Sequence, residues 1–77
     1  MTTTAVPIDL PGGHLLRQDG NAHYTLYRDG VPVGYITSVE GIYVVHRGRR
    51  RDHAVEIGQT VSLKHAISLA MHAVAHS

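Results

Sequence analysis

The segment 60–76 constrains the fold most, because it has the clearest helical pattern in the chain. Its apolar residues recur at the spacing i, i+3, i+4, i+7, i+8 and i+11, which is one face of an amphipathic helix. These residues are Leu63, Ala66, Ile67, Ala70, Met71 and Val74. Ser62, or alternatively Thr60, is expected to cap the helix through its hydroxyl oxygen. The upstream segments have the pattern of short strands, which need such a helix to pack on.

The opposite side of this helix carries histidines. His65, His72 and His76 fall within a narrow stripe that points away from the apolar face, and Leu69 is expected to be exposed among them. His72 and His76 have the i, i+4 spacing of a metal clip. No cysteine or carboxylate lies near them in the sequence to complete a site, so we predict a solvated face with no metal and no cofactor.

Strand patterns and turn dipeptides alternate before the helix. Asp29-Gly30 and Glu40-Gly41 are typical of hairpin turns. The predicted strands are 23–28, 31–37, 42–47 and a short one at 53–57, and 14–17 could add another. The sequence therefore predicts an α+β fold, a three- or four-stranded antiparallel meander followed by one C-terminal helix packed on one sheet face.

The first residues are predicted to lie outside this domain. Pro7 and Pro11 interrupt regular pairing, so residues 1–13 are expected to form a flexible N-terminal arm and 14–77 a single domain. The alternation of Val6, Ile8 and Leu10 leaves open an edge strand or an arm that docks on a partner.

The strands have more large apolar groups than one helix can cover. A three-residue loop at Asp29-Gly30 would place Tyr24, Leu26, Gly34 and Ile36 beneath the helix, with Ile42, Val44, Val55 and Ile57. A two-residue turn would shift this register. The first register leaves a second face, which together with Leu69 is the predicted partner-binding surface: Tyr27, Val33, Tyr35, Tyr43, Val45 and Leu69. Alternatively, residues 6–16 fold back over it.

Length and composition favour self-association. The 77 residues contain no Trp, Phe or Cys, so the core is small and has no disulfide to support it. We therefore expect a homodimer. The lack of cysteine and of a secretory signal favours a cytoplasmic protein, and no apolar run reaches the length of about 20 residues that spans a bilayer.

One charged cluster suggests a different function. Arg47, Arg49, Arg50 and Arg51 surround Gly48 at a predicted hairpin tip, where guanidinium groups could contact phosphates. With Tyr35 and Tyr43 they could form a nucleic-acid surface. The net charge of +1 does not by itself indicate nucleic acid, and a solvated tip that protects a sheet edge is the alternative.

Two resemblances follow from this pattern. The stretches YRDGVPVGYI, GIYVVHRGRRR and SLKHAISLA, within residues 23–76, resemble the three-strand-plus-helix plan of the arm-binding domains of tyrosine integrases and of AP2-type DNA-binding domains. The chain lacks the strongly basic sheet and the tryptophan of that pattern. It also resembles short βββα proteins of actinobacteria and their phages, which implies an accessory or interaction factor and identifies no site residue.

Catalytic patterns are missing from the sequence. No phosphate-binding glycine loop is present, and no serine has a base evident from its sequence position. We predict a non-catalytic protein-interaction module, a homodimeric accessory or host-interaction factor with an unidentified protein partner and no membrane association. A DNA- or RNA-binding module is the alternative.

Overall fold

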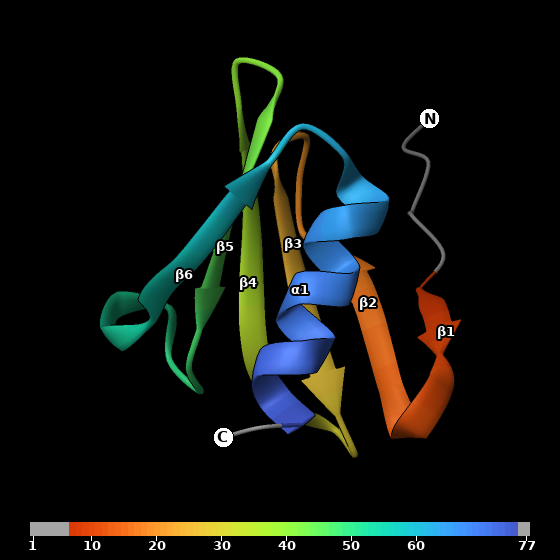
Figure 1. Cartoon of the computed structure of the whole chain (residues 1–77). Helices are drawn as coiled ribbons and strands as arrows, with labels where there is room; N and C mark the ends of the chain where they lie inside the picture. Colours follow the sequence, from red (N-terminus) through yellow and green to blue (C-terminus); the bar gives the residue numbers. More distant parts are fainter. Residues whose placement is uncertain (1–6, 76–77) are drawn as a thin grey trace.

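The protein is a six-stranded antiparallel sheet with one helix on one face (Figure 1). The computed structural model describes residues 7–75. The strands are β1 (Ile8–Leu10), β2 (His14–Gln18), β3 (His23–Arg28), β4 (Val31–Val39), β5 (Ile42–Arg47) and β6 (Val55–Thr60). Two short 3-10 turns are η1 (Pro11–Gly13) and η2 (Arg51–His53), and the helix is α1 (Leu63–Ala75). The predicted α+β class is confirmed, whereas the predicted number of strands is wrong.

The extra strands lie at the start of the chain. Ile8–Leu10 forms β1 and pairs with β2, which is the edge strand left open as an alternative to the flexible arm expected over 1–13. Pro7 and Pro11 flank this strand, and it lies at the edge of the sheet, where a missing N–H breaks no ladder. Val6, the first member of the alternating trio, lies outside the described residues.

Two tight turns set the register of the central strands. Asp29 and Gly30 have φ of 51° and 82°, and Glu40 and Gly41 have φ of 50° and 83°. Positive φ at both central residues is the geometry of the two-residue type I′ turn. Arg28 therefore lies opposite Val31. Val39 lies opposite Ile42 in the same way.

The register explains which face predictions fail. At the first turn a bulge adds Val33 to β4, so Leu26 faces Gly34 as predicted, although the turn has two residues rather than three. No bulge follows the second turn to offset its length, and Ile36 therefore lies opposite Val45. Val45 therefore lies beneath the helix. The prediction that Ile42 and Val44 would lie there is wrong.

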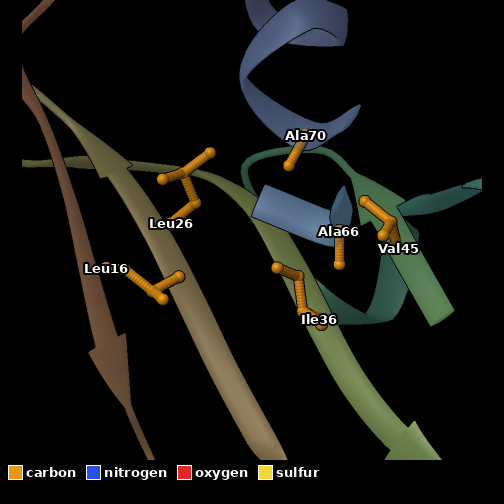
Figure 2. Packing of buried hydrophobic residues seen from close by; sticks show 6 residues of the cluster. All are labelled: Leu16, Leu26, Ile36, Val45, Ala66 and Ala70. Atoms are coloured by element: carbon orange, nitrogen blue, oxygen red, sulfur yellow. The ribbon is translucent and has the colours of Figure 1, made fainter. Parts of the chain in front are cut away.

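The core is a row of strand side chains under α1. Leu16, Leu26, Ile36 and Val45 are fully buried and point toward Ala66 and Ala70 (Figure 2). The helix comes close because these two residues are alanines. It packs on β4, β5 and β6, and a Cβ built on Gly34 would lie 3.9 Å from the Cβ of Ala70.

The helix begins where the sequence indicated. The N–H of His65 lies 3.4 Å from the hydroxyl oxygen of Ser62, so Ser62 is the N-cap as predicted. The helix then runs for 13 residues to Ala75. In residues 7–75 no helix has both the length and the apolar character needed to cross a membrane.

Candidate interaction surfaces

The structure does not bring the predicted partner-binding residues together. Tyr43 and Val45 belong to the helix side of the sheet, where Val45 is fully buried, so their predicted exposure on the other face is wrong. Leu69 packs against the core, and a Cβ on Gly58 would come within 2.6 Å of its methyl group. Leu69 is therefore turned toward β6 and is not exposed among the histidines.

The remaining three members of the predicted set do not stay together on one face. Val33 is the bulged residue of β4 and packs against the core cluster. Tyr27 and Tyr35 do lie on the face opposite the helix, because they alternate with Leu26 and Ile36 along their strands. Only these two tyrosines keep their predicted place.

The face opposite the helix is covered by a loop of the chain itself. The guanidinium of Arg51, in η2, lies 4.7 Å from the ring centre of Tyr35. The hydroxyl of Tyr35 donates a hydrogen bond of 2.9 Å to the carbonyl of Arg49. Tyr35 is only 7% exposed and neighbouring Thr25 only 3%. The loop 48–54 thus covers the centre of this face, a role that the sequence analysis considered only for residues 6–16.

Asp19 ties this loop to the sheet. Its carboxylate accepts a 2.7 Å hydrogen bond from Arg17 and one from the Thr25 hydroxyl, and it lies 3.6 Å from Arg51. Partial burial acts to raise the pKa of Asp19. The hydrogen bonds from Thr25 and Arg17 and the charges of Arg17 and Arg51 outweigh it, so its pKa is lowered. Asp19 is therefore held as a carboxylate.

The four arginines of the predicted tip separate into three environments. Arg51 lies on Tyr35, and Arg50 is paired with Asp52 at 3.5 Å. Arg47 and Arg49 instead line a hollow with Arg28. Arg28 was not among the residues predicted from the sequence, although the sequence contains a signal for it. Arg28 and Arg47 end the two strands on either side of β4, and such strands run in the same direction and end at the same edge.

This hollow, the arginine hollow, has a volume of about 520 Å³. It lies between the β3–β4 turn and the β5–β6 loop. Its lining is formed by Arg28, Asp29, Val31, Val33, Arg47, Gly48 and Arg49. Three guanidinium groups and one carboxylate give it a formal charge of +2, with two valines as apolar wall. Anionic ligands suit such a surface.

A second, apolar hollow lies between the helix and the first strand. This groove of about 490 Å³ is formed by Leu10 and Pro11 on one side and the helix on the other. The helix contributes Leu63, Lys64, Ile67, Ser68 and Met71. Most of its wall is hydrocarbon, with Lys64 and Ser68 the polar members. The sequence pattern assigned Leu63, Ile67 and Met71 to the core and did not indicate a groove.

Neither histidine of the helix face joins a metal-binding cluster in the described residues. His65 and His72 are exposed, and residues 7–75 contain no group of three or more His, Cys, Asp or Glu placed to hold a metal. His76, the partner of His72 in the predicted clip, lies outside the described residues. Known proteins add nothing to this picture, because no protein-family model, no curated protein and no solved structure matches the chain.

Proposed function

We propose that this chain is a non-catalytic protein-interaction module that forms a homodimer through its apolar groove. The observation that carries the proposal is the groove itself, whose wall is mostly hydrocarbon along one side of α1 and against β1. Exposed apolar surface of this kind is typical of protein interfaces. A small core, in a chain without cysteine, favours gaining further burial by association.

A second copy fits the groove because a matching knob lies beside it. Ile8 is 51% exposed, and it shares the helix side of β1 with Leu10, which lines the groove. A two-fold dimer needs one surface that carries both the knob and the hole. Ile8 of each copy can then enter the groove of the other, beside Ile67 and Met71.

The solution mass, measured by light scattering in low and high salt, tests this proposal. We expect a dimer that persists in high salt, because the contact is apolar. Ile8→Asp should weaken the dimer by at least about tenfold, since it places a charge against hydrocarbon. Val61→Asp is the matched control, because Val61 is 79% exposed and does not line the groove.

Two results would count against the homodimer. A monomer at every concentration would refute it, and so would equal weakening by Ile8→Asp and Val61→Asp. A cytoplasmic site of action and an accessory role also belong to the proposal. The first is supported by the lack of cysteine in the sequence.

Nucleic-acid binding by the four arginines of the tip is the weaker alternative. Arg50 and Arg51 are engaged with Asp52, Asp19 and Tyr35, so only Arg47 and Arg49 share a surface. The loop 48–54 also covers the sheet face that an AP2-like protein would lay in a DNA groove. Light scattering with a mixed-sequence DNA duplex tests this alternative. If it holds, the measured mass should show a protein–DNA complex in low salt and not in high salt.

A further inference from the structure

We propose that the arginine hollow binds the phosphate group of a nucleotide or of a nucleic-acid strand. This inference is independent of the homodimer, because no residue lines both the hollow and the apolar groove. It also differs from the tip predicted from the sequence, since Arg28 replaces Arg50 and Arg51.

The register aims two arginines at the same place. Arg28 alternates with Leu26, and Arg47 with Val45, so both project on the helix side of the sheet. Both end strands that flank β4, where Arg28 lies opposite Val31 and Arg47 lies opposite Gly34.

The third arginine is held by its backbone. The N–H of Gly48 donates to the carbonyl of Val33 at 3.0 Å, and the carbonyl of Arg49 accepts from Tyr35 at 2.9 Å. Tyr35 is in turn covered by Arg51. The backbone of Gly48 and Arg49 is therefore held in place before a ligand arrives, which lowers the entropy cost of binding.

The charges in the hollow are available to a ligand. Across residues 7–75, no ion pair joins Arg28, Arg47 or Arg49 to a carboxylate, in contrast to Arg17, Arg50 and Arg51. Asp29 lines the hollow but is directed toward the β1–β2 turn, where a Cβ on Gly13 would lie 2.7 Å from its carboxylate oxygen. Guanidinium groups bind phosphate oxygens in pairs of parallel hydrogen bonds.

The size and wall of the hollow suit the rest of a nucleotide. A volume of about 520 Å³ falls within the range of small-molecule sites. Val31 and Val33 offer an apolar surface on which a base or sugar can rest while its phosphate meets the arginines. A free nucleotide and a nucleic-acid strand both carry the phosphate group that the hollow would bind.

Amide chemical shifts of the full chain, measured during titration, provide the test. The ligands are inorganic phosphate, adenosine 5′-monophosphate and a short thymidine oligonucleotide. We expect shifts centred on Asp29, Gly30, Val31, Gly48 and Arg49. Saturation by the mononucleotide identifies a nucleotide site. Binding of the oligonucleotide alone, with an affinity that falls with salt at a logarithmic slope of up to about −2 for three contacts, identifies a strand site.

Single variants locate the binding. Arg28→Gln and Arg47→Gln should each lower affinity by at least about tenfold, and for a strand should reduce the salt slope by about 0.7. Both arginines are exposed, so both variants should fold, and Arg49→Gln is a further check. Arg50→Gln is the control, because Arg50 does not line the hollow. The absence of shifts with all three ligands, shifts centred elsewhere, or equal loss in Arg50→Gln would overturn the proposal.

Discussion

Among single residues, Asp19 holds together three parts of the chain. It joins β2 through Arg17, β3 through Thr25 and the loop 48–54 through Arg51. Replacing it with asparagine removes the charge while keeping the size. The charged hydrogen bonds are thereby weakened, and we expect the free energy of unfolding to fall by about 1–3 kcal/mol at neutral pH.

This loss should depend on pH in a defined direction. Because the folded-state pKa of Asp19 is lowered, its stabilisation is fully present above the unfolded pKa of about 3.9 and disappears as pH falls through the folded value. Urea denaturation of wild type and Asp19→Asn should therefore converge in acid, below about pH 4. Asp52→Asn, at an exposed pair, is the control. Parallel curves for wild type and Asp19→Asn would contradict this account.

Gly34 allows close packing of its neighbours because it has no side chain. A Cβ there would lie 3.3 Å from the carbonyl oxygen of His46 and close to both Leu26 and Ala70. Valine favours strands, yet we expect Gly34→Val to destabilise the fold by about 1–3 kcal/mol through overpacking. Thr37→Val, on the same strand and the opposite face, should change stability little. Thermal unfolding distinguishes the two, and an unchanged Gly34→Val would show that the helix can move away.

At the scale of elements, the loop 48–54 acts as the cover of the second sheet face. Arg51→Ala should remove its contacts with Tyr35 and Asp19 and cost about 1 kcal/mol. It should also raise the quenching of tyrosine fluorescence by acrylamide, which is readable because the chain has no tryptophan. Arg50→Ala should leave quenching unchanged, since Arg50 is 72% exposed in its side chain and does not touch Tyr35. Equal quenching in the two variants would show that the loop does not cover Tyr35 through Arg51.

The elements were more predictable than the faces they present. Local pattern located the helix, its cap and the three central strands, because amphipathic spacing and turn dipeptides act over a few residues. The face assignment failed at β5, since it depends on whether the Glu40-Gly41 turn contains an even or odd number of residues. β1 was predicted only as an alternative to a flexible arm, because three residues between two prolines carry little pattern.

The candidate sites were less predictable, for a related reason. The sequence marked Arg47 and Arg49 by their place in a charged run, yet it could not separate them from Arg50 and Arg51. That separation depends on the fold of the loop over Tyr35. Arg28 is a single charge before a turn, and only the pairing of both strands with β4 brings it to the same hollow.

For the whole molecule, association and stability should be coupled. If the groove closes only between two copies, the unfolding temperature should rise with protein concentration, because association favours the folded state by mass action. Scanning calorimetry over a wide concentration range measures this. The same scans on Ile8→Asp should show a temperature independent of concentration. If the unfolding temperature of the wild type is also independent of concentration, folding is not coupled to self-association.

The order of the strands affects how the protein folds during synthesis. Each strand pairs with its neighbours in the chain, so successive hairpins can form as the polypeptide leaves the ribosome. The helix follows all six strands and covers the row from Leu16 to Val45. The nascent sheet therefore carries an open apolar face until α1 has emerged. A chain that ends at Thr60 would keep that face open and present it to chaperones.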